Sequence, residues 1–95
     1  MNVVWTLNAL QHLTDIYEHI SKDSPRYASR MVDRITSRSQ QIGSFPESGQ
    51  VVIEYDDPRI REVIEGPYRV IYRHDSATIE VLAVIHGARL LPPLT

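Results

Sequence analysis

Arginine and histidine recur between Ile60 and Arg89, in a pattern that could bind or cleave a phosphate ester. Arginine offers a planar fork of N–H groups to a phosphate, and histidine can give or take a proton near neutral pH. Metal-independent RNA cleavage needs a base, an acid and cations for the developing charge. The candidates that we expect on one face of the predicted strands are Arg61, Arg69, Arg73 and His86.

Three predicted antiparallel strands would position these side chains. The strands are Ile60–Glu65, Tyr68–Arg73 and Thr78–His86, and they are rich in Val, Ile, Tyr and Thr, as half-buried pleated surfaces prefer. Gly66-Pro67 and Asp75-Ser76 separate them and predict turns.

The lengths of these turns decide which side chains share a face, because alternate residues of a strand point to opposite faces. We expect a three-residue first turn that pairs Ile64 with Tyr68, since a two-residue turn would bury the charge of Arg61 unpaired. We also expect His74 to pair with Ala77. The predicted core face is then Ile60, Glu62, Ile64, Tyr68, Val70, Tyr72, Ile79, Val81, Ala83 and Ile85. The predicted opposite face is Arg61, Val63, Arg69, Ile71, Arg73, Glu80, Leu82, Val84 and His86.

An aliphatic strip on the second of these faces has no obvious cover: Val63, Ile71, Leu82 and Val84. An exposed strip of this kind usually marks a binding surface. The alternative is that the apolar C-terminal tail, which contains Leu90, Leu91 and Leu94, folds back and covers it.

The first half of the chain predicts a strand and two helices. Apolar spacing and capping residues indicate an antiparallel helical hairpin. The predicted elements are a strand over Asn2–Trp5, a helix from Thr6 or Asn8 to about Ser21, a helix from Ser24-Pro25 to a cap at Gly43, and a strand over Gln50–Tyr55. The predicted fold is α+β: one domain over residues 1–95, with a four-strand antiparallel meander packed on the helical hairpin.

Four arginines recur every four residues on the second helix: Arg26, Arg30, Arg34 and Arg38. Such a row is either a solvated helix face or a ridge that meets an acidic partner.

Composition limits the function classes. The net charge of −2 argues against an independent nucleic-acid binder, which is usually clearly basic. There is no cysteine, and His12 and His19 lack further ligands, so we expect no metal and no cofactor. No signal peptide or membrane span is predicted.

Several motifs resemble those of the RelE/ParE superfamily of toxins from bacterial type II toxin–antitoxin modules. Their residues are more similar to those of the ParE branch than to those of RelE. The motifs are Val4-Trp5, Asp23-Ser24-Pro25, Phe45-Pro46, Arg61-Glu62, the Tyr68–Tyr72 run, and Val84–Gly87 with Arg89.

The resemblance implies a cytoplasmic toxin that inhibits growth, acts in plasmid stabilisation and is neutralised by a cognate antitoxin. ParE-like members are associated with inhibition of DNA gyrase, whereas RelE-like members cleave messenger RNA on the ribosome. The resemblance implies no membrane partner, and contact with DNA only through the antitoxin. We expect a ParE-like, non-enzymatic inhibitor of gyrase, with the RelE-like ribonuclease as the alternative.

The resemblance also suggests site residues. Arg69 and His86, and less securely Arg61, match positions where ribonuclease members carry catalytic residues. The chain departs from RelE because it has no lysine after Lys22 and no aromatic residue following His86. The residues we expect to bind the antitoxin or target are Arg26, Arg30, Arg34, Val63, Ile71, Arg73, Leu82, Val84 and Arg89. For Arg73 the alternative is an ion pair with Glu80.

Overall fold

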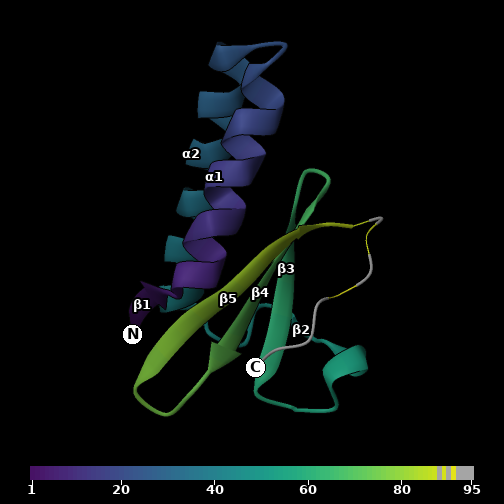
Figure 1. Cartoon of the computed structure of the whole chain (residues 1–95). Helices are drawn as coiled ribbons and strands as arrows, with labels where there is room; N and C mark the ends of the chain where they lie inside the picture. Colours follow the sequence, from purple (N-terminus) through teal and green to yellow (C-terminus); the bar gives the residue numbers. More distant parts are fainter. Residues whose placement is uncertain (88, 90, 92–95) are drawn as a thin grey trace.

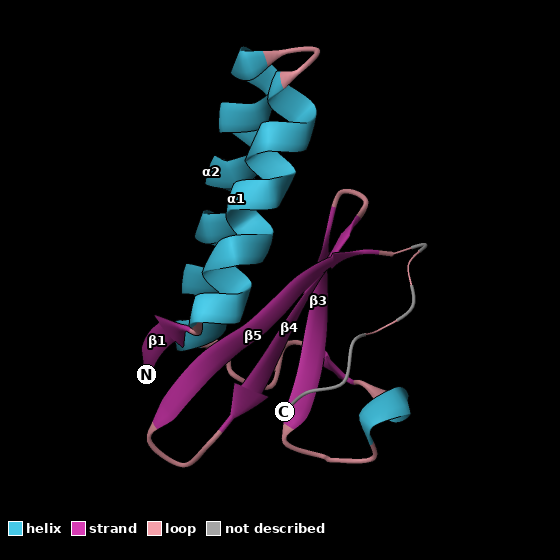
Figure 2. Ribbon diagram, in the orientation of Figure 1, coloured by secondary structure: helices cyan, strands magenta, loops and turns pink. Residues whose placement is uncertain are grey.

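A computed structural model describes residues 1–87, 89 and 91, and it folds as a helical hairpin on a five-stranded sheet (Figures 1 and 2). The helices are α1 (Leu7–Ser21) and α2 (Pro25–Ser44). The strands are β1 (Asn2–Trp5), β2 (Gln50–Val51), β3 (Ile60–Glu65), β4 (Tyr68–His74) and β5 (Thr78–His86), and a 3-10 turn, η1 (Ile53–Tyr55), follows β2. The strand order is β1-β5-β4-β3-β2.

The sheet is mixed, because β1 runs parallel to β5 while the other neighbours are antiparallel. Both helices lie on one face of the sheet, and the loop that joins them projects beyond its edge (Figure 1). The predicted α+β architecture is confirmed. No helix in the described part of the chain is long and apolar enough to cross a membrane.

Both helix starts follow the sequence signals. The Thr6 hydroxyl accepts a hydrogen bond from the Ala9 amide at 3.1 Å, and the Ser24 hydroxyl accepts one from the Tyr27 amide at 3.1 Å. The predicted cap at Gly43 is wrong, since α2 continues to Ser44. Gly43 instead lets β1 approach: a Cβ at this position would lie 2.9 Å from the Met1 carbonyl oxygen.

Apolar side chains bury both faces of the sheet. The core between sheet and helices comprises Ala9, Ile16, Met31, Ile35, Ile42, Val63, Tyr68, Val70, Tyr72, Ile79, Val81 and Val84. A second cluster on the opposite face comprises Val52, Ile60, Ile71 and Ala83, with Tyr55, Leu82, Ile85 and Leu91 packed against it. The predicted strand over Gln50–Tyr55 is too long, because Val52 turns into this cluster and η1 follows.

The turn between β3 and β4 has two residues, so the predicted three-residue turn is wrong. Glu65 pairs with Tyr68, and Gly66 takes a left-handed φ of 58°. Arg61 does lie on the helix side, but its guanidinium is hydrogen-bonded to the backbone there. Its guanidinium lies at the end of the sheet and donates to the Gly49 carbonyl at 2.8 Å.

A bulge in β5 shifts the second register. Ile71 pairs with Ala83 but Tyr72 pairs with Val81, which leaves Leu82 as the extra residue. The Asn8 side chain donates to the Leu82 carbonyl at 3.2 Å. The expected pairing of His74 with Ala77 is also wrong, because His74 pairs with Ile79.

The two-residue turn and the β5 bulge move several side chains of β3 and β5 to the face opposite the predicted one. Arg61, Val63, Val84 and His86 lie on the helix side, by their pairing with Tyr72, Val70 and Tyr68. The opposite side takes five residues expected in the core: Ile60, Glu62, Ile64, Ala83 and Ile85.

Candidate functional site

The three candidate catalytic residues do not meet in one site. Arg69 lies on the face of the sheet away from the helices, whereas Arg61 and His86 lie on the helix side. Arg61 pairs with Tyr72 and His86 with Tyr68, so the two are about 13 Å apart along the sheet at roughly 3.3 Å per strand residue. The expectation that these residues and Arg73 share one face is therefore wrong.

Arg69 is bound by carboxylates. Its Nε and Nη2 donate to the two Glu62 carboxylate oxygens at 2.8 and 2.5 Å, and Nη2 lies 3.5 Å from Glu54. The side chains of Arg69 and Glu62 are only 14% and 16% exposed. The hydrogen bonds to Glu62 raise the pKa of the Arg69 guanidinium further above its usual range. A fork held in this way has little capacity left for a phosphate.

Arg73 takes the alternative expected from its sequence, a hydrogen-bonded ion pair with Glu80 directly across β4 and β5. Both side chains are about one-third exposed, at 34% and 33%. Arg73 and Arg69 share the face that carries the second cluster.

The predicted aliphatic strip does not exist as one exposed surface. Val63 and Val84 are 4% and 3% exposed within the core under the helices. Ile71 is fully buried in the second cluster, against which Leu82 packs. Of the apolar tail, Leu91 packs on this cluster, while Leu90 and Leu94 lie outside the described residues. Burial thus removes Val63, Ile71 and Val84 as direct contacts for a partner.

The arginines of α2 form an exposed, mixed-charge surface. Arg34 pairs with Glu65 at 2.8 Å, and Arg38 donates to Gln41 at 3.0 Å. With Arg30 they line a shallow hollow of about 330 Å³. Asp33 lines the same hollow, and its negative charge reduces the net positive charge of the row.

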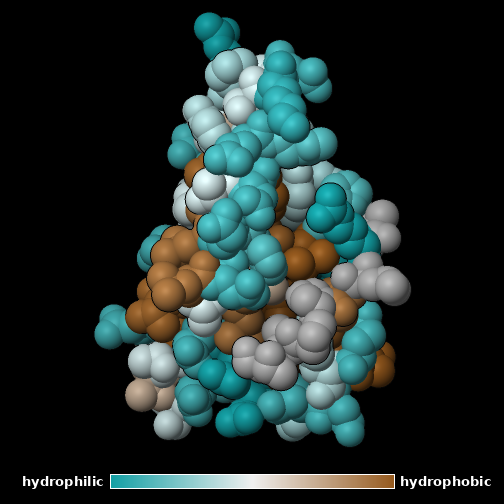
Figure 3. Space-filling model, in the orientation of Figure 1, coloured by the Kyte–Doolittle hydropathy of each residue, from teal (hydrophilic) through white to brown (hydrophobic). Residues whose placement is uncertain are grey.

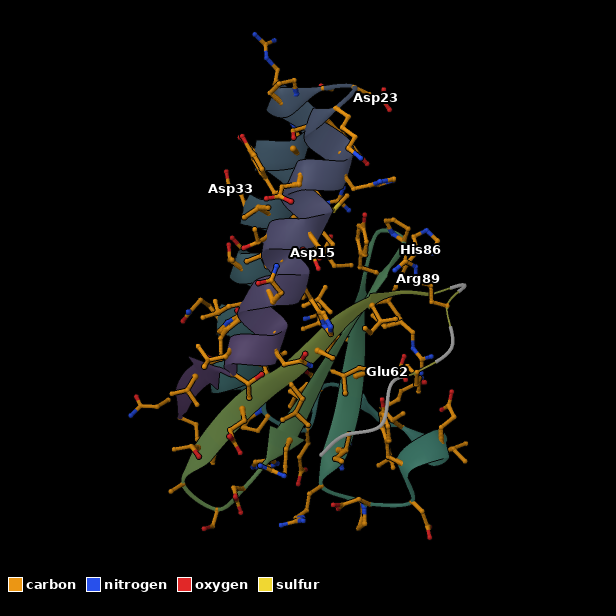
Figure 4. All side chains as sticks on the ribbon, viewed as in Figure 1. Asp15, Asp23, Asp33, Glu62, His86 and Arg89 are labelled. Atoms are coloured by element: carbon orange, nitrogen blue, oxygen red, sulfur yellow. The ribbon has the colours of Figure 1, made fainter. Side chains whose placement is uncertain are left out.

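A cleft between α1 and the end of β5, here the α1–β5 cleft, has a volume of about 440 Å³. Its lining residues are His12, Asp15, Ile16, His19, Tyr68, Val84, Ile85, His86 and Arg89. Figure 4 shows His86 and Arg89 at the same end of the sheet, with Asp15 on α1. The sequence did not predict this cleft, because the β5 bulge is what turns Val84 and His86 toward α1. The seven-residue spacing of His12 and His19, two turns along α1, was the available signal.

Two contacts fix side chains in the cleft. The Val84 amide donates to His12 Nδ1 at 3.2 Å, and burial lowers the pKa of His12, with Asp15 acting in the opposite sense. The Tyr68 ring meets the His86 ring edge-on, with centroids 5.7 Å apart. Burial raises the pKa of the Tyr68 phenol, and Tyr27 adds to that rise while the charge of Arg89 opposes it.

Among the residues that the structure describes, no three His, Cys, Asp or Glu side chains gather closely enough to hold a metal ion. A metal centre therefore has no candidate in this part of the chain.

Solved structures share this fold. The chromosomal ParDE toxin–antitoxin system from P. aeruginosa contains a chain that aligns with a TM-score of 0.75 and 22% identity, over 90% of this chain and 95% of that one. A YoeB/ParE toxin from Agrobacterium tumefaciens aligns with a TM-score of 0.62 and 22% identity, over 90% and 98%.

Sequence relatives identify the family. The model of the ParE toxin of the type II toxin–antitoxin system parDE matches residues 3–91. Toxin RelE2 of Caulobacter vibrioides is 33% identical over 93% of this chain and 97% of its own length. Putative toxin Y4kP of Sinorhizobium fredii is 34% identical over 93% and 90%. The chain belongs to the ParE family of toxins in the RelE/ParE superfamily, and this membership implies a cognate antitoxin.

Proposed function

We propose that this chain inhibits DNA gyrase by binding to it in the cytoplasm, and that its cognate antitoxin neutralises it by direct contact. The chain would then need a complementary surface and no group that transfers protons. The observation that supports the proposal most is that Arg61, Arg69 and His86, the candidate residues of a ribonuclease, do not meet in one site. The match to the ParE family model adds to this support.

The residues we assign to partner contact are four exposed arginines and the half-buried Arg73. Arg26, Arg30 and Arg34 lie along α2, Arg73 lies on the opposite face of the sheet, and Arg89 follows β5. Arginine suits protein interfaces because its fork can bind carboxylates and its stem covers apolar surface. Leu82 lies in the bulge and is partly buried, so only the accessible part of its side chain can contact a partner.

The ribonuclease alternative is favoured by the name of one relative, the Caulobacter toxin RelE2. The local geometry weighs against it in this chain. Glu62 occupies the Nε and Nη2 edge of the Arg69 guanidinium, and His86 lies on the other face of the sheet. A phosphate bound by Arg69 would have no histidine beside it to act as acid or base.

Supercoiling by purified gyrase tests the proposal. Increasing amounts of the toxin should stop the supercoiling of relaxed plasmid, and the protein encoded beside the toxin should restore it. Relaxation of the plasmid by topoisomerase I serves as the control and should continue. Undisturbed supercoiling at saturating toxin would contradict the gyrase assignment.

A further inference from the structure

We propose that the α1–β5 cleft binds a carboxylate on an otherwise aliphatic segment of the cognate antitoxin. This inference rests on the proposed neutralisation by an antitoxin and names the chemistry of one contact. It assigns a role to His12, His19 and Asp15, which the sequence pattern had left on the helix surface.

Hydrogen-bond donors dominate the polar part of the cleft lining, in which Arg89 and Asp15 carry opposite charges. His12 already accepts the Val84 amide at Nδ1, so the proton of its neutral ring lies on Nε2 and that atom can only donate. His19 and the Arg89 guanidinium add further donors to the lining. The Tyr68 phenol is near enough to Arg89 for the arginine to oppose the rise in its pKa.

Among the described lining residues the only carboxylate is that of Asp15, and one of its oxygens accepts a hydrogen bond within α1. Gln11 donates from its side-chain amide to Asp15 Oδ1 at 2.8 Å, one turn earlier on α1. This bond occupies one lone pair of Asp15 and leaves its negative charge in place. Asp15 therefore competes with an incoming anion, but the donors around the cleft outnumber this one carboxylate.

The floor of the cleft is apolar and favours a carboxylate that is flanked by aliphatic side chains. Ile16 and Val84 supply the apolar floor, and they are 9% and 3% exposed. In Figure 3, brown apolar surface reaches up to teal polar residues of the helical hairpin.

A nucleic-acid phosphate fits this site less well than a peptide carboxylate. Tyr68, the tyrosine among the described lining residues, is 7% exposed and its ring contacts the His86 ring, so it offers no open face for a base to stack on. The chain also carries a net charge of −2, which disfavours a nucleic-acid partner.

Two substitutions with opposite expected effects on the Kd test the proposal. Titration calorimetry measures the Kd, with the protein encoded beside the toxin as the probe. Arg89→Met keeps the stem and removes the charge, and it should raise the Kd about 10-fold or more, the size of a hydrogen bond to a charged group. Asp15→Asn removes the competing carboxylate, and it should lower the Kd by about 2- to 5-fold.

Arg59→Met is the matched control for the loss of charge. Arg59 is exposed, pairs with Asp57 at 3.0 Å, and precedes β3 outside the cleft lining. Its removal should leave the Kd within about 2-fold of wild type. Thermal unfolding of each variant checks the fold, and if Arg89→Met unfolds the chain, the Asp15→Asn result decides alone.

Unchanged Kd values for Arg89→Met and Asp15→Asn would overturn the cleft assignment, while tight binding by the wild-type chain would leave the proposed neutralisation intact. Weaker binding by Asp15→Asn would also overturn it, because the occupant would then be cationic. Loss of oligonucleotide binding with unchanged antitoxin affinity would assign the cleft to nucleic acid instead. Failure of the wild-type chain to bind the neighbouring protein would contradict the proposed neutralisation itself.

Discussion

The ion pair between Arg69 and Glu62 holds two charges against the second cluster, where water screens them poorly. Glu62→Gln keeps the shape and removes the charge that both guanidinium nitrogens contact. We expect a loss of about 1–3 kcal/mol in the free energy of unfolding, as for a hydrogen bond to a charged group. Urea denaturation at neutral pH measures it.

Glu80→Gln is the matched control, because it breaks the more exposed pair with Arg73 and should cost less than about 1 kcal/mol. Equal losses for the two variants would show that the Arg69 pair gains nothing from its burial.

His12 should make the stability of the fold depend on pH. Burial lowers its pKa in the folded chain, so the unfolded chain binds the proton more readily. This stability is present above the unfolded value of about 6.5 and is lost as the pH falls below that value and through the lowered pKa of the folded chain. His12→Gln retains an acceptor for the Val84 amide but cannot titrate.

Urea unfolding of wild type and His12→Gln at pH 7 and pH 5 measures this effect. Wild type should lose more stability over this interval than the variant, and the other histidines should cancel in the comparison. A steeper loss in His12→Gln would show that Asp15 outweighs burial at this site.

At the scale of elements, the loop after α2 is fixed to the sheet at Gly49. A Cβ there would lie 2.6 Å from the Glu62 carbonyl oxygen and 2.7 Å from the Tyr72 hydroxyl. That hydroxyl donates to Pro46 at 2.7 Å and accepts from the Gly49 amide at 3.1 Å. Gly49→Ala should therefore cost about 1–3 kcal/mol through overpacking.

Gly87→Ala provides the comparison, since its Cβ would meet only the Pro67 carbonyl oxygen at 3.4 Å. Thermal unfolding should place this variant close to wild type and Gly49→Ala well below it. Similar melting temperatures for both would mean that the loop moves away from Tyr72 at little cost.

The elements themselves could be predicted from local signals. Ser24-Pro25 and Thr6 start the helices where their chemistry indicated, because capping depends on residues three positions apart. Strand composition identified β3, β4 and β5. The registers could not be predicted, because they depend on two distant contacts. The Gly49 carbonyl accepts a hydrogen bond from the Arg61 guanidinium, and the Thr6 and Asn8 side chains donate to the carbonyl of the bulged Leu82.

The placement of the candidate site residues on the sheet depended on those registers, so the predicted placement was only partly right. Parity correctly placed Arg69 and Arg73 on one face, but one turn and one bulge moved Arg61 and His86 to the other. A shift of a single residue reverses every side chain that follows it. The α1–β5 cleft arises from this reversal.

At the scale of the whole molecule, the central claim is that this ParE-family toxin acts by binding and not by proton transfer. His86→Gln tests it most directly, because glutamine is similar in size and polarity but is neither acid nor base near pH 7. Within the α1–β5 cleft the same change should affect neutralisation by the antitoxin more than toxicity.

The decisive measurement follows cells that express His86→Gln, recording plasmid supercoiling and protein synthesis over time. We predict that the variant remains toxic and that supercoiling fails, with filamentation, before translation stops. A ribonuclease that lost its acid or base would be about 10²- to 10⁴-fold slower. Early arrest of translation by the wild-type toxin, with ribosome-dependent cuts in messenger RNA that His86→Gln abolishes, would contradict the account.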